Sequence, residues 1–292
     1  MGDALLKATL ESVSRYGDTE AEPWHTGVLT SKERAILHRE CTSPSEFDEL
    51  RSRASFYERF RSGDIEPVIR QTAHGKVIAL LEHPSQEQEI PWALWSRILQ
   101  GFASFTGPSF YTVFLCAHPA LRIFPEHSHS PIRPFHINGG YTYPCDKSCV
   151  FIYRAEDATR VLLHELLHAA CTDRKGVHLE QMEAETEAWA ELLWCAFLSR
   201  GGLKKMKALV ATQSRWMAAQ NERLVRHGHM GPGPQMFPWR YTLGKTQMWM
   251  RWGIYRPGDI SGASLPTSLR LTVPPTAAQK RAFGVSASSV FL

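Results

Sequence analysis

The stretch VLLHELLHAACTD, residues 161–173, constrains this chain more than any other, because it sets three titratable side chains in an apolar run. His164 and His168 are four residues apart, and Glu165 directly follows the first histidine. A polar group in apolar surroundings is costly unless it is paired, and a charged one is more so. We therefore expect these three groups to share a function rather than to fill a plain core helix.

On a helix, residues four apart lie on one face, so His164 and His168 could both bind one zinc ion at about 2.0–2.1 Å. Glu165 would lie about 100° further round the helix, beside the ion. From there its carboxylate could take a proton from a metal-bound water. This is the His-Glu-x-x-His arrangement of zinc peptidases. The alternative is a core helix whose histidines bond to backbone carbonyls.

A third ligand would come from the following helical segment, which is rich in glutamate: Glu180, Glu183, Glu185, Glu187 and Glu191. If the two helices turn back on each other around Gly176, residues equally far from it meet. His164 and His168 lie 12 and 8 residues before Gly176, and Glu187 lies 11 after it. We predict Glu187 as the third ligand, with Glu183 as the second choice.

The spacing of His164-Glu165-x-x-His168, then 18 residues, then Glu187 resembles that of the gluzincin metallopeptidases. It matches the aminopeptidases of the leukotriene-hydrolase type and is one short of thermolysin. The resemblance covers about residues 135–200. It implies a zincin-like fold, a Zn2+ cofactor and peptide hydrolysis. In that clan, an acid four residues after the ligand glutamate orients the first histidine, and Glu191 occupies that place.

The resemblance also implies an edge strand ahead of the metal helix that pairs with the substrate backbone. FHINGGYTY, residues 135–143, could be this strand. We expect Asn138, Gly139 and Gly140 to bind substrate, although a simple glycine turn or bulge explains them equally well. The aminopeptidases carry an acidic residue here, which weakens an assignment as aminopeptidase.

An oxyanion-stabilising donor is expected downstream of the metal helix. Tyr241 is the first choice, and His227, His229 and Tyr255 are alternatives.

The order of the elements predicts a predominantly helical α+β fold with a small mixed sheet ahead of the metal-binding helix, and the resemblance implies that this fold is zincin-like. Residues 110–119 and 149–154 have strand character, and residues 74–84 fit a strand or a short helix. We expect a helical N-terminal region at 1–99 and a metallopeptidase domain at 100–256. Residues 257–292 would form an extended or partly disordered tail.

Composition and charge argue against several classes of protein. The net charge of +4, from 33 basic and 29 acidic residues, includes no basic run, which argues against nucleic acid. No apolar stretch approaches the roughly 20 residues of a membrane helix, and the first residues do not resemble a secretory signal. The six cysteines mostly lie in apolar sequence, typical of free thiols in a reducing, cytoplasmic compartment. Cys145 and Cys149 could instead form a disulfide or half a metal site.

These observations favour a zinc-dependent peptidase that acts on a peptide or protein substrate, with Glu165 as general base. One alternative is an inactive zincin-like scaffold that binds a protein and keeps a structural zinc. Another is a helical protein without metal, in which the motif is accidental. No pattern indicates the oligomeric state.

Overall fold

A computed structural model of the chain describes residues 2–17, 20–105, 107, 109–127, 130–228, 231, 234–258, 260 and 265–292. The chain divides into two units, and each gathers three segments that are distant in the sequence. Unit 1 comprises Met1–Asp18, Leu121–Ile137 and Asp173–Pro274, and unit 2 comprises Thr19–Ala120, Asn138–Thr172 and Pro275–Leu292.

The sheet of unit 2 is mixed. Its strands are β1 (His25–Thr26), β2 (Val68–Gln71), β3 (Gly75–Leu80), β4 (Tyr111–Cys116), β5 (Gly140–Thr142) and β6 (Val150–Ile152), in the spatial order β1-β2-β3-β4-β6-β5. β3, β4 and β6 run parallel, and the other pairings are antiparallel. β3 and β4 are buried along their whole length, as expected for central parallel strands with both faces covered. Because β5 comes last in the spatial order, it is an edge strand of this sheet.

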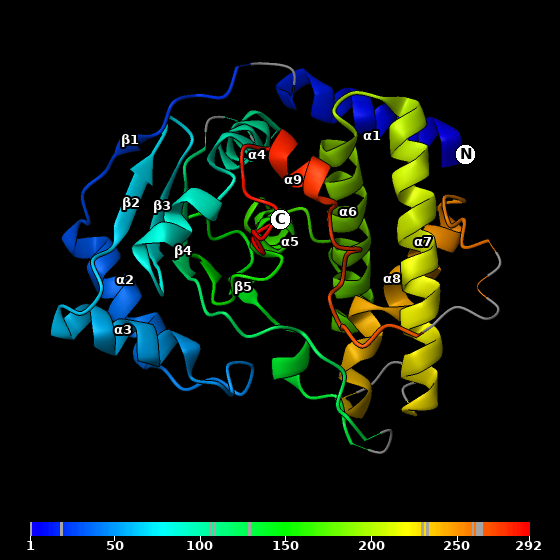
Figure 1. Cartoon of the computed structure of the whole chain (residues 1–292). Coiled ribbons are helices and arrows are strands. Elements are labelled where there is room, and N and C mark those ends of the chain that lie inside the picture. The colour runs from blue at the N-terminus through cyan, green and yellow to red at the C-terminus, as the bar shows by residue number, and fades with distance from the viewer. Residues whose placement is uncertain are drawn as a thin grey trace. The chain divides into compact units, whose positions relative to one another are not determined.

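Helices cover both faces of this sheet (Figure 1). α2 (Ser31–Thr42) and α3 (Ser52–Ser62) pack against alternate side chains of the strands, such as Ile78, Phe114 and Phe151. α4 (Trp92–Phe105) and α5 (Ala158–Ala169) contact each other and the strands β3, β5 and β6. A short 3-10 helix η1 (Pro84–Glu89) and the helix α9 (Ala277–Ala282) complete the unit.

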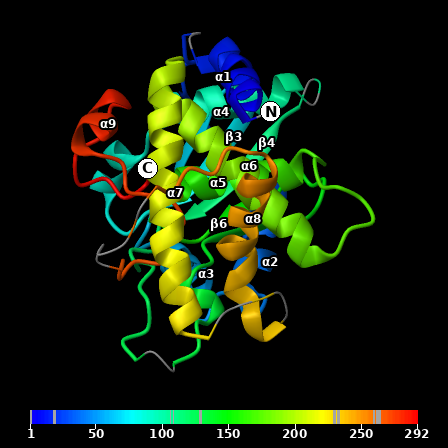
Figure 2. The same cartoon turned by 90° about the vertical axis from the view of Figure 1, so that its right-hand side faces the viewer.

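Helices alone make up the regular structure of unit 1 within the described residues, apart from an isolated bridge between Ile123 and Ser268. They are α1 (Gly2–Gly17), η2 (Pro134–His136), α6 (Leu179–Ser199), α7 (Leu203–Arg226), η3 (Pro234–Tyr241) and α8 (Leu243–Arg251). α6 packs against α1, α7, α8 and η3, and α7 also contacts α8 (Figure 2).

The predicted α+β class is confirmed: helices predominate, and a small mixed sheet precedes the helix that carries the histidines. The segment at 74–84 becomes β3 and not a helix. α4 runs across the expected domain boundary at residues 99 and 100. The described part of the C-terminal tail contains α9, and its last two residues, Phe291 and Leu292, are buried. Among the described helices, none combines the length and the apolar character required to cross a bilayer.

Candidate metal centre

α5, which carries both histidines and Glu165, is buried along its whole length and is fixed at its first turn. The indole N–H of Trp95 on α4 donates to the Thr159 hydroxyl at 2.8 Å. The backbone N–H of Thr159 donates to the carbonyl of Phe291 at 2.8 Å, so the chain terminus covers the start of the helix. The start of α5 is thus held by α4 and by the last residues of the chain.

The two imidazoles converge as the four-residue spacing predicts. The Nε2 atoms of His164 and His168 lie 3.1 Å apart, and each residue is only 6% exposed. Two nitrogens bound to one tetrahedral zinc at about 2.0–2.1 Å are separated by about 3.3 Å. The nitrogens of this pair therefore already have close to the separation that one ion requires.

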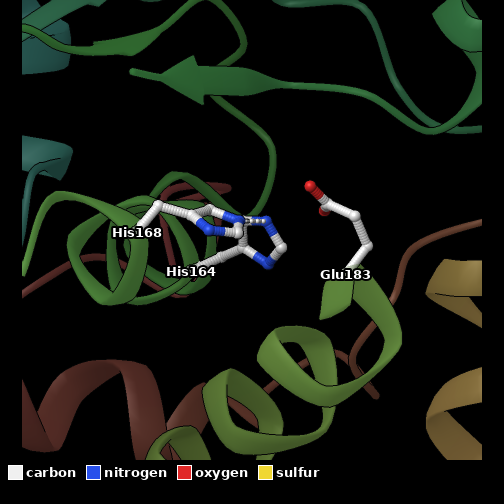
Figure 3. Close-up of side chains that lie close together, drawn as sticks. All are labelled: His164, His168 and Glu183. Carbon is white, nitrogen blue, oxygen red and sulfur yellow. Dashed lines mark hydrogen bonds between the residues drawn. The ribbon is translucent and has the colours of Figure 1, made fainter. Parts of the chain in front are cut away.

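A carboxylate joins these imidazoles. One ligand atom from each of His164, His168 and Glu183 lies within 4.8 Å of the other two, and these residues could hold a metal ion. Figure 3 shows the three side chains, with Glu183 rising from α6. Two imidazoles and one carboxylate are a donor set found in catalytic zinc sites. Glu187, the first choice from the sequence, is not part of this group.

The packing of α6 against α8 explains why Glu183 and Glu187 differ. Three contacts come from α8: Gly244 lies against Ala184, the Trp249 indole N–H donates to the carbonyl of Ala188, and Lys245 pairs with Glu191. At 100° per residue, Glu187 is about 70° and Glu183 about 110° from the centre of this stripe. Glu187 is accordingly buried at 1% exposure, whereas Glu183 is only half-buried.

Glu191, predicted to orient the first histidine, has a buried ion pair with Lys245. The Lys245 Nζ atom lies 3.3 Å from its Oε2 atom, and it also donates to the carbonyl of Leu271 at 2.9 Å. The Lys245 ammonium compensates a carboxylate that is fully enclosed. The orienting role of Glu191 stays a prediction.

Glu165 lies against the edge strand. A Cβ atom on Gly140 would be 3.3 Å from the Glu165 Oε1 atom and 2.6 Å from the Val161 Cγ1 atom. Because residue 140 has no side chain, α5 can lie directly against the backbone of β5. As a result, the carboxylate of the expected general base is held beside the backbone of β5.

The predicted substrate-binding residues Asn138, Gly139 and Gly140 stand at the start of β5. The carbonyl of Gly139 accepts a hydrogen bond from the N–H of Tyr153 at 2.8 Å, so this carbonyl is engaged within the protein. Asn138 is half-buried, and its side chain makes no hydrogen bond to the described part of the chain. Its amide is thus the group of the three that could contact a ligand.

A buried network fixes β5. The Tyr141 hydroxyl donates to Glu40 at 2.7 Å and accepts from Arg53 at 2.8 Å, and its ring stacks on Phe151. Burial raises the pKa of Tyr141; Arg53 opposes this rise, and the hydrogen bond to Glu40 adds to it. The hydroxyl therefore remains a proton donor. No sequence pattern links Tyr141 to residues about a hundred positions earlier, so sequence reasoning missed this network.

A disulfide clamps the other end of α5. Cys145, just after β5, bonds to Cys171, just after α5, and the backbone N–H groups of both donate to the carbonyl of His168 at 3.0 Å. The expectation of free thiols is wrong for this pair, because residues 26 apart give no local signal of contact. Cys149, the suggested partner of Cys145, is instead a buried free thiol. Burial above all, and then Glu40, raises the pKa of Cys149 to about 12.

The oxyanion donors proposed from the sequence lie in unit 1. Tyr241 is the last residue of η3, and it packs against an apolar cluster that includes Phe124 and Leu269. His227 directly follows α7, and its ring contacts that of Phe124 in a tilted arrangement. Tyr255 has a pKa raised by burial. His229 lies outside the described residues. The donor role stays a prediction for each of them.

Comparison of the chain with protein-family models, with curated proteins and with solved structures gives no match. What the centre can do follows from the chemistry of its own residues.

Proposed function

We propose that this chain is a zinc-dependent peptidase of zincin type, with His164, His168 and Glu183 as metal ligands and Glu165 as general base. The observation that carries the proposal is the placement of Glu165. Glu165 directly follows His164, one of the two paired histidines, in the sequence. In space, its carboxylate lies against the edge strand β5. An acid in that position serves catalysis, because a purely structural metal site does not need a base.

The donor set supports zinc. Imidazole nitrogens with one carboxylate suit zinc among the common metals, and three protein ligands leave a fourth position open for water. When bound, a zinc ion would lower the pKa of that water and polarise the scissile carbonyl. Glu183 replaces Glu187 in the proposal because its carboxylate belongs to the group that includes both imidazoles.

Glu165 would move the proton. It accepts a proton from the attacking water and then gives it to the nitrogen of the departing amine, so the carboxylate is regenerated in each cycle. The Gly140 position lets this carboxylate approach the strand backbone. A proton acceptor held there lies close to any peptide that runs along β5.

A peptide substrate fits the edge strand. β5 is the last strand in the sheet order, and an extended peptide can add to such an edge through backbone hydrogen bonds. The Asn138 amide could bind a substrate carbonyl at the start of the strand. Tyr141 holds the strand rigid through Glu40 and Arg53. Tyr241 remains the proposed oxyanion donor.

The ligand assignment is tested by counting zinc in purified protein. We expect one zinc per chain in the wild type, and loss of zinc in His164→Ala, His168→Ala and Glu183→Gln. Glu185→Gln is the matched control, because Glu185 lies on the same helix and pairs with Arg174 at the surface. Zinc retained in Glu183→Gln but lost in Glu187→Gln would return the third ligand to Glu187.

The peptidase activity is tested with a mixed peptide pool analysed by mass spectrometry. Glu165→Gln should keep zinc and lose cleavage, because the amide cannot accept the proton. A wild-type protein that binds zinc but cleaves no peptide would favour the scaffold with structural zinc. Protein purified without chelators and free of zinc would overturn the proposal.

A further inference from the structure

Unit 2 has a second feature with the properties of a binding site, on the opposite side of the sheet from α5. A pocket of about 480 Å³, open to solvent, is formed where α2 meets α3. Its lining residues are Ser31, Arg34, Ala35, His38, Tyr57 and Arg61. None of these six is acidic, and none belongs to the metal centre.

The positive charge of this pocket is uncompensated. Within the described residues, neither Arg34 nor Arg61 has a carboxylate at ion-pair distance; the Arg34 guanidinium lies over the ring of Phe60. The acid next to Arg34 in the sequence, Glu33, is bound elsewhere, because Lys76 donates to both of its carboxylate oxygens at 2.8 Å. Arg34 and Arg61 are thus two lining residues whose positive charges are not paired with a carboxylate in the described part of the chain.

Tyr57 adds a hydroxyl group to the lining of the pocket. Tyr57 is 7% exposed, its ring packs against His38 at 5.5 Å, and it lines the pocket. In the part of the chain that the structure describes, its hydroxyl makes no hydrogen bond. A ligand in the pocket can therefore bond to this hydroxyl.

The start of α2 adds a second hydroxyl group. Ser31 is the first residue of this 12-residue helix and lines the pocket. The helix N-terminus itself is already capped, because the Thr30 side chain accepts a hydrogen bond from the Glu33 N–H and the Glu33 carboxylate accepts one from the Thr30 N–H. The pocket thus combines two cations and two hydroxyls.

We propose that this pocket binds the phosphate group of a small phosphorylated molecule. The planar guanidinium groups of Arg34 and Arg61 can each donate two hydrogen bonds to phosphate oxygens. Tyr57 and Ser31 donate to the remaining oxygens. A volume of about 480 Å³ falls within the range of about 300–1,000 Å³ typical of small-molecule sites. That volume leaves room for an organic group beyond the phosphate, next to the rings of Tyr57 and His38.

Isothermal titration calorimetry with phenyl phosphate tests the proposal, with phenol and benzoate as probes that lack the phosphate, and inorganic phosphate as the probe that lacks the ring. We expect phenyl phosphate to bind at least about tenfold more tightly than phenol or benzoate, because its nearly dianionic group offers three oxygens to the two guanidiniums, whereas benzoate offers two oxygens and a single charge and phenol is neutral. Inorganic phosphate should compete with it. Equal affinity for benzoate, or no binding of phenyl phosphate, would overturn the assignment.

Variants locate the site. Arg34→Gln/Arg61→Gln should weaken phenyl phosphate binding by at least about tenfold, and Tyr57→Phe should weaken it by a smaller factor. Arg281→Gln, in α9, is the matched control and should bind as the wild type does. Unchanged binding in the double arginine variant would refute this location. Thermal unfolding of each variant separates lost binding from lost folding.

Discussion

Gly140 on the edge strand and Val161 on α5 approach each other so closely that residue 140 has no room for a side chain, and the carboxylate of Glu165 lies beside them. A Cβ atom there would lie 3.3 Å from the carboxylate oxygen and 2.6 Å from Val161 Cγ1. The glycine therefore sets the distance between β5 and α5. It couples the position of the proposed base to the strand on which a peptide would lie.

Replacing Gly140 with alanine should push α5 away from β5. We expect a loss of about 1–3 kcal/mol in the free energy of unfolding, as for other overpacked positions, and a larger fractional loss of kcat than of substrate affinity. Urea denaturation and steady-state kinetics measure the two effects. Gly231→Ala is the control, because a Cβ there meets nothing within 4 Å. Equal stability of the two variants would contradict this account of Gly140.

The Cys145–Cys171 disulfide should stabilise the fold and the end of α5. Closing a loop with a sequence separation of 26 removes unfolded-chain entropy worth about 3–4 kcal/mol. Cys145→Ser/Cys171→Ser should lose about this much in urea denaturation, and zinc affinity should fall as the His168 carbonyl loses its two fixed donors. Dithiothreitol should reproduce the effect in the wild type and change nothing in the double variant. A wild type that is indifferent to the reductant would argue against this role.

The ion pair of Lys245 and Glu191 predicts that a single variant loses much more unfolding free energy than the double variant that removes both charges. Lys245→Met leaves a buried carboxylate without its cation, and should cost about 3–5 kcal/mol of unfolding free energy. Glu191→Gln/Lys245→Met removes both charges and should recover much of that loss.

Zinc binding by Glu191→Gln alone separates the two roles of this residue. If Glu191 orients a histidine, zinc affinity should fall by about 10–100-fold. If it serves mainly to pair with Lys245, stability should change and zinc affinity should not.

Glu33 predicts a specific dependence of stability on pH. Partial burial acts to raise the pKa of Glu33, but hydrogen bonds from Lys76 and Thr30 outweigh it, so the pKa lies below its usual value. A depressed carboxyl pKa contributes stability above the unfolded-state pKa, and this contribution is lost as the pH falls through the folded-state pKa. Glu33→Gln should therefore be less stable than the wild type at pH 7, by about 1–3 kcal/mol. The difference should shrink below about pH 4. A difference that is constant between pH 3 and 7 would show that the Glu33 charge is not responsible.

Much of α5 could be predicted from the sequence because its pattern is local. A helix places residues four apart on one face whatever surrounds it, so the convergence of His164 and His168 follows from their spacing. The buried strand β4 was predictable for a similar reason, since a run of β-branched and aromatic residues favours a strand, whereas the segment of β3 fitted a strand or a short helix equally well. Glu165 followed from the same helical geometry.

The identity of the carboxylate that lies with the two imidazoles could not be predicted from local geometry. Counting outward from Gly176 assumes a symmetric hairpin, but the chain from Ala170 to His178 takes a course that its sequence does not specify. Packing of α8 along Ala184, Ala188 and Glu191 turns α6 so that Glu187 lies near the packed stripe and Glu183 lies off it. That rotation depends on residues more than 50 positions further along the chain.

By itself, the sequence determined which residue types stand together on one helix, because hydrogen bonds within four residues fix that geometry. Only the tertiary structure decided which acid joins the imidazoles, which cysteine closes the loop and what fills the space above Gly140. Those outcomes depend on close packing between segments far apart in the chain, and no local periodicity records that packing.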